Sequence, residues 1–170
     1  MQGSVPTVPQ SGIDISRLRR FELFKDLADR ELSAIARCCR KASHPADTLV
    51  LRQGEVAREI FFLEDGAVNV YSEKLGQIRR IALIEAPGVF GEFALMNCDH
   101  VRTATVRAAT DVQVLALSFA NMIAALRSIP ALKEHFRLLL QQRGIGDSSA
   151  TDSGTITPTD ETAKLEALCG

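Results

Sequence analysis

Two short stretches, Phe90-Gly91-Glu92-Phe93-Ala94-Leu95 and Arg102-Thr103-Ala104-Thr105-Val106, are the most informative part of this 170-residue sequence. A carboxylate directly follows a glycine turn, and an arginine comes ten residues later. Alternation predicts that Arg102 opens a strand and lies on its apolar side with Ala104 and Val106. An unpaired buried charge is costly, and this face offers no acidic side chain. The pattern therefore predicts an anionic ligand for the guanidinium.

The residues around Arg102 suit a cyclic phosphodiester attached to a ribose. The guanidinium of an arginine can bind two exocyclic phosphate oxygens through charge-assisted hydrogen bonds. Gly91 lets a ligand approach the backbone N–H groups of a short helical turn over Glu92–Leu95. Glu92 is placed to accept a hydrogen bond from the ribose 2′-hydroxyl. Thr103 can give its hydroxyl to a phosphate oxygen or to the base.

The composition predicts one soluble globular domain with tails. The apolar fraction is 46%, the charged fraction is 24% and the net charge is −1, so long-range attraction to nucleic acid or to an anionic membrane is not expected. No apolar run approaches the roughly 20 residues of a membrane span. The N-terminal segment lacks the basic start and apolar core of a secretory signal. We expect a cytoplasmic protein without nucleic-acid partners or direct membrane contact.

The cysteines and histidines form no recognisable metal or redox motif. Cys38 and Cys39 are adjacent, and such neighbours are poorly placed for a shared disulfide. His44, His100 and His135 are isolated in the sequence. The sequence also contains no recognisable nucleophile–base pair. We expect reduced thiols, no metal, no cofactor and no enzymatic activity.

The periodicity predicts an α+β, mainly β fold. A helical pattern over Phe21–Arg40 carries Leu32, Ile35, Ala36 and Cys39 at helical spacing. Short strands separated by turn residues follow, and we expect them at Thr48–Arg52, Ile60–Glu64, Ala67–Tyr71, Gln77–Ile84, Arg102–Ala108 and Val112–Leu117. This spacing favours a double-stranded β-helix (jelly-roll) barrel over a sheet of βαβ units.

Helices are expected to return after the strands. Ser118 is a plausible N-cap for a helix over Phe119–Arg127, and Ser128 with Pro130 predicts the start of a second helix. The second helix carries an apolar stripe and ends near Gly144. The stripe consists of Leu132, Phe136, Leu139 and Leu140. It either packs as core against the barrel or moves when a ligand binds.

The chain divides into three predicted parts. We expect a flexible leader over residues 1–13, one domain over 14–143, and a polar flexible tail over 144–170 with room for a short terminal helix. Arg143 near the end of the second helix either caps a nucleotide base or is an exposed helix-terminal arginine. Arg79 and Arg80 are either an exposed hairpin face or a second anion site.

Gly91–Leu95 together with Arg102–Val106 resembles the phosphate-binding cassette of the cyclic-nucleotide-binding domain family. That family includes bacterial catabolite activator proteins, regulatory subunits of protein kinase A and cyclic-nucleotide-gated channels. Leu49–Glu55 and Ile60–Tyr71 resemble the early strands of the family with their turn glycines. Two loops depart from the common pattern. The approach Pro87–Gly91 is a residue shorter, and the loop before Arg102 lacks a proline.

The resemblance implies a role for each residue of the cassette. Glu92 would bind the ribose hydroxyl and Arg102 the cyclic phosphate, with Thr103 beside the phosphate. The backbone of Gly91, Phe93 and Ala94 would complete the pocket. The ligand would be cAMP or cGMP.

The function predicted from these observations is that of a regulatory sensor whose C-terminal helices respond to the ligand. It would be a stand-alone module or would regulate a channel, transporter or kinase, in cis or in trans. Nothing after Arg143 resembles a DNA-reading domain. Two alternatives remain at this point. One is a non-binding domain of the same fold in which Glu92 and Arg102 pair with each other, and the other is a cupin-type metalloenzyme.

Overall fold

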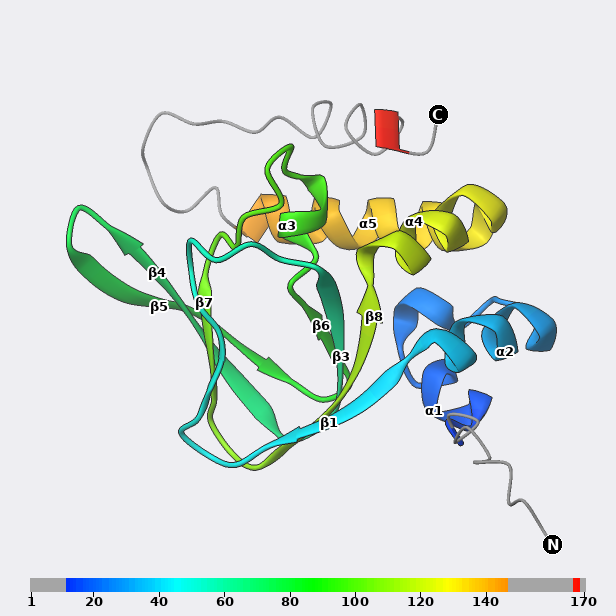
Figure 1. Ribbon diagram of the computed structural model, residues 1–170, viewed down its shortest axis with the longest axis horizontal. Coiled ribbons are helices and arrows are strands. Elements are labelled where there is room, and N and C mark those ends of the chain that lie inside the picture. The colour runs from blue at the N-terminus through cyan, green and yellow to red at the C-terminus, as the bar shows by residue number, and fades with distance from the viewer. Residues whose placement is uncertain (1–11, 147–166, 169–170) are drawn as a thin grey trace, which may run out of the picture.

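Two four-stranded antiparallel sheets face each other and form a jelly-roll barrel, with the helices gathered outside it (Figure 1). The computed structural model describes residues 12–146 and 167–168. One sheet has the order β1-β8-β3-β6 and the other β2-β7-β4-β5. The strands are β1 (Arg40–His44), β2 (Leu49–Leu51), β3 (Glu59–Asp65), β4 (Ala67–Lys74), β5 (Gln77–Glu85), β6 (Gly88–Phe90), β7 (Thr105–Ala108) and β8 (Val112–Ser118). The predicted fold class is confirmed.

All six predicted strands are present, but two further strands were missed. β1 is an edge strand whose side chains are mostly exposed, so its sequence lacks the apolar alternation of a half-buried strand. β6 has only three residues and is too short for a periodicity. The prediction that a strand opens at Arg102 was wrong, because β7 begins at Thr105.

The predicted helix over Phe21–Arg40 was too long. The structure has a 3-10 turn η1 (Glu22–Phe24) and a shorter helix α2 (Asp29–Cys38) there, and Arg40 already belongs to β1. A further helix, α1 (Ile15–Arg19), was not predicted. The backbone N–H of Ala28 donates to the Glu31 carboxylate at 2.8 Å, which stabilises the start of α2. The predicted stripe of Leu32, Ile35, Ala36 and Cys39 is buried.

The two helices after β8 form as predicted. In α4 (Phe119–Ser128) the Ser118 hydroxyl oxygen accepts from the Asn121 N–H at 3.2 Å. α5 (Pro130–Gly146) continues two residues beyond Gly144, where the tail was expected to begin. Its predicted stripe packs as core in this structure, with Leu132, Phe136 and Leu140 buried and Leu139 half-buried.

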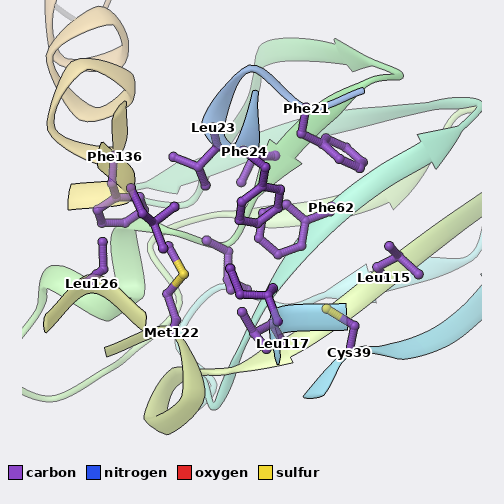
Figure 2. Close-up of a cluster of buried hydrophobic side chains, with 14 of the residues drawn as sticks. Phe21, Leu23, Phe24, Cys39, Phe62, Leu115, Leu117, Met122, Leu126 and Phe136 are labelled. Carbon is purple, nitrogen blue, oxygen red and sulfur yellow. The ribbon is translucent and has the colours of Figure 1, made fainter. Parts of the chain in front are cut away.

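Side chains on opposite faces of one sheet fill two separate cores. In β3, Ile60 and Phe62 contact the helices, whereas Phe61 and Leu63 point into the barrel. Figure 2 shows the helix-facing core, where the Phe62 ring lies 4.9 Å from that of Phe24. Burial on both faces explains the continuous apolar run of this strand.

Most of the predicted leader and tail lie outside the described residues. Ile13 is buried in the helix-facing core, and Ala167 and Leu168 are helical. Among the described helices, none is long and apolar enough to cross a membrane.

Candidate functional site

The site begins at a sharp turn between β6 and the four-residue helix α3 (Phe93–Met96). Gly91 has a φ of +83°, which side-chain-bearing residues rarely adopt. A Cβ at this position would lie 2.7 Å from Nη1 of Arg102. Glycine is therefore required both by the backbone conformation and by the approach of the arginine. The predicted helical turn is present, one residue later than expected.

The Glu92 carboxylate is completely buried and only half satisfied. Its Oε1 accepts a hydrogen bond from the guanidinium of Arg143 on α5, which also donates to the Val89 carbonyl. Within the described part of the chain, its Oε2 has no hydrogen-bond partner. Burial raises the pKa of Glu92, and the charges of Arg143 and Arg102 oppose that rise. The structure thus holds an orphaned acceptor inside the protein.

Two carbonyl groups hold the buried guanidinium of Arg102. Nη1 donates to the Gly91 carbonyl at 3.1 Å, and Nη2 donates to the Glu59 carbonyl at 2.9 Å. The guanidinium carbon also lies 5.5 Å from the centroid of the Phe61 ring and 5.9 Å from that of Phe119. Burial lowers the pKa of Arg102, and nearby glutamates oppose this effect. These contacts use two of the five N–H groups of a guanidinium.

The sequence argument for an unpartnered Arg102 was therefore incomplete. It considered side chains on one strand, but the acceptors are backbone carbonyls, and one of them lies 43 residues earlier in the chain. The backbone of Arg102 also pairs outside any regular strand, with its N–H donating to the Glu55 carbonyl at 2.8 Å. Glu55 in the loop before β3 therefore holds the Arg102 backbone, while Glu59 at the start of β3 and Gly91 hold its guanidinium.

Arg102 lines two cavities on different sides of the site. One has a volume of about 350 Å³ and is bounded by β1, β2 and the loop that leads into β3. The other, of about 470 Å³, lies along the loop from Met96 to Thr103. Thr103 is exposed, Phe93 is half-buried and Ala94 is buried. Arg102 thus contacts Gly91 and lines the second cavity together with Thr103, whereas Glu92, Phe93 and Ala94 line neither cavity.

The geometry bears on two of the alternatives. Glu92 pairs with Arg143 and not with Arg102, so the alternative of an ion pair between Glu92 and Arg102 is wrong. The interpretation of Arg143 as an exposed helix-terminal arginine is also wrong, because only a quarter of its side chain is exposed and its charge faces Glu92. Arg79 and Arg80 are exposed on β5.

Sequence reasoning considered Arg143 only as a cap for a nucleotide base or an exposed arginine and did not predict its pairing with Glu92, although a signal was present. Arg143 follows Leu132, Phe136 and Leu140 at helical spacing, so a charge continues the buried stripe of α5. The same reasoning had singled out Arg102.

For metal binding, residues 12–146 and 167–168 contain no group of three or more His, Cys, Asp or Glu side chains that could hold an ion.

Comparisons with known proteins place these observations in context. The sequence model of the cyclic nucleotide-binding domain matches residues 41–128. A cyclic nucleotide-gated potassium channel from Rhizobium etli is 35% identical over 127 residues, which cover 72% of this chain and 33% of the channel. The cyclic AMP receptor protein of Thermus thermophilus is 27% identical over 122 residues, 71% of this chain and 56% of that protein. This chain thus spans about a third of the length of the channel.

Solved structures show the same architecture. The catabolite activator protein of Thermus thermophilus superposes with a TM-score of 0.65 at 27% identity, over 72% of this chain and 58% of that one. The regulatory domain of Toxoplasma gondii protein kinase A, crystallised with cAMP, gives a TM-score of 0.67 at 19% identity, over 79% and 49%. At 19% identity, the likeness to the Toxoplasma gondii domain shows a shared fold only.

Proposed function

This chain belongs to the cyclic nucleotide-binding domain family, a regulatory class of domain, and we propose that it binds cAMP or cGMP as a sensor. The observation that carries the proposal is the orphaned Oε2 of Glu92, a buried residue directly before the start of α3. An unsatisfied buried acceptor costs about 1–3 kcal/mol. A ligand that brings a hydroxyl donor to this atom removes that cost.

The ribose 2′-hydroxyl is the group proposed to donate to Glu92. Because Oε1 is already bound to Arg143, the hydroxyl and the guanidinium need not compete for one oxygen. Displacing Arg143 would leave a buried carboxylate facing a neutral partner, which is unfavourable. We therefore assign Oε1 to Arg143 and Oε2 to the ligand.

Arg102 is proposed to bind the cyclic phosphate. The carbonyls of Gly91 and Glu59 hold two of its N–H groups, and the remaining donors are available for phosphate oxygens. An arginine fixed before the ligand arrives loses little side-chain freedom on binding, which favours affinity. The backbone of Gly91, Phe93 and Ala94 would complete the pocket, with the Thr103 hydroxyl beside the phosphate.

The C-terminal helices are proposed to respond to the ligand through Arg143. Glu92 has no exposed surface, so a ligand can reach it only after the groups that cover it move. Arg143 keeps its contact with Oε1 and belongs to α5, so a shift of the groups around Glu92 is passed to α5 through this contact. A ligand that favours one position of α5 shifts the population of that position. A channel, transporter or kinase, in cis or in trans, is the proposed class of effector, and we propose no cofactor and no chemical reaction.

Titration calorimetry with cAMP, cGMP and a cyclic dinucleotide tests the proposal. The parent chain is expected to bind a cyclic mononucleotide, and Arg102→Leu should weaken that binding at least about 100-fold by removing two charge-assisted bonds. Arg79→Leu removes an exposed arginine and serves as the matched control. Arg102→Lys keeps the charge without the fork, and it replaces the leucine variant if that variant does not fold.

Either of two results would overturn the proposal. One is a folded parent chain that binds neither cAMP nor cGMP. The other is a folded Arg102 variant that retains the affinity of the parent. Recovery of the nucleotide unchanged after incubation checks that binding occurs without hydrolysis.

A further inference from the structure

A contact far from the cassette joins the end of α4 to the C-terminal turn of the chain. Arg127 donates from Nε at 3.3 Å and from Nη2 at 3.0 Å to the carbonyl oxygen of Leu168, 41 residues later. The Leu168 side chain is half-buried and packs against the helix-facing core. Figure 1 shows the short C-terminal helical turn on the side of the molecule occupied by α4 and α5.

The chemistry of the two partners is complementary. Carbonyl groups in the last turn of a helix have no partner within that helix. Leu168 lies in the described helical piece near the C-terminus, and Arg127 supplies two N–H groups from one guanidinium to its carbonyl oxygen. The leucine side chain adds apolar burial to this polar contact.

We propose that the end of α4 is a docking surface for a short apolar helical segment, filled in this chain by its own C-terminal turn. The surface consists of the Arg127 guanidinium and the adjoining part of the helix-facing core that receives Leu168. The occupant is the chain's own segment at Leu168, which presents a leucine side chain and a backbone carbonyl to this surface. This proposal does not depend on nucleotide binding.

The position of the surface gives docking a structural consequence. α4 ends at Ser128 and α5 begins at Pro130, so Arg127 lies directly before the joint between them. α4 also packs against α2, β3 and β8. A segment docked at Arg127 therefore stabilises the helix arrangement at this joint.

A spin label on Cys169, the residue after Leu168, tests the contact directly. In a chain with Cys38→Ser and Cys98→Ser, the label would broaden the amide NMR signals of the last turn of α4 selectively. Cys39 is buried and can remain. Leu168→Asp should abolish this selective broadening, and Arg127→Ala should reduce it. Leu75→Asp changes a fully exposed leucine on the β4–β5 turn and is the matched control that should leave it unchanged.

Amide hydrogen exchange of the unlabelled chain provides a second readout. Loss of the Leu168 contact should speed exchange in the last turn of α4 about tenfold, while exchange in the barrel strands stays unchanged. Absence of selective broadening in the parent would overturn the proposal. So would broadening or exchange at α4 that is the same in Leu168→Asp as in the parent.

Discussion

Replacing Arg143 with alanine should destabilise the chain far more than the loss of an ordinary surface arginine. The substitution removes the partner of Glu92 Oε1 and leaves a completely buried carboxylate without a compensating charge. Breaking a buried ion pair costs about 3–5 kcal/mol. Because a quarter of the Arg143 side chain is exposed to solvent screening, we expect a cost below this range, about 2–3 kcal/mol.

The cost should also depend on pH in a defined direction. Burial raises the pKa of Glu92, and Arg143 is the strongest influence opposing that rise. A carboxyl whose pKa is raised by folding contributes stability below its unfolded pKa of about 4.3, and this contribution is lost as the pH rises through the folded value. Without Arg143 the folded pKa rises further. The destabilisation by Arg143→Ala should therefore be large near neutral pH and should shrink as the pH falls toward about 4.

Urea unfolding of a double-mutant set measures both effects. The set comprises the parent, Arg143→Ala, Glu92→Gln and the combination, each at neutral and at acidic pH. The combination should be more stable than Arg143→Ala, because no charge is then buried alone. Arg137→Ala, on the same helix, removes an exposed pair with Glu134 and is the matched control. The reasoning is refuted if Arg143→Ala costs no more than Arg137→Ala, or if its cost is the same at both pH values.

Three further predictions concern the cassette and the thiols. Glu92→Gln should reduce the preference for cAMP over its 2′-deoxy analogue from about tenfold or more to a few-fold, as measured by calorimetry; an unchanged preference would remove Glu92 from ribose recognition. Gly91→Ala should cost at least about 1–2 kcal/mol in urea unfolding, because it forces a side chain into a left-handed conformation and against Arg102. A thiol reagent at mildly alkaline pH should modify exposed Cys98 but not Cys39 in the native chain, since burial raises the pKa of Cys39 to about 12; rapid labelling of Cys39 would contradict the core packing.

The sequence predicted the features that depend on neighbouring residues. Turn glycines and short apolar runs located six strands, and the Ser118 cap located the start of α4. The break between η1 and α2 was not predictable from spacing, because it depends on how Phe21 and Phe24 pack against Phe62 of β3. Long-range packing of this kind overrides the local helical pattern.

The partners of the charged residues were the least predictable part of the site. Sequence spacing identified Arg102 as a charge on a buried face and Glu92 as a site residue, but it could not show which groups would reach them. The Glu59 carbonyl lies 43 residues from Arg102, and Arg143 lies 51 residues from Glu92. A carbonyl carries no sequence signal, since every residue has one. Arg143, in contrast, did carry a sequence signal, because it continues the buried stripe of α5.

The two charges of the cassette differ in what a ligand would change. Arg102 is held by two carbonyls before any ligand arrives, so its contribution to binding is largely preorganised. One oxygen of Glu92 is instead bound by Arg143 of α5, and the other has no hydrogen-bond partner among the described residues. If a ribose hydroxyl donates to the second oxygen, ligand affinity and the docking of α5 depend on one carboxylate. By linkage, the factor by which the Arg143 contact changes the affinity for the ligand equals the factor by which the ligand changes the equilibrium of that contact. Glu92, more than Arg102, is therefore the residue at which recognition and helix movement would be coupled.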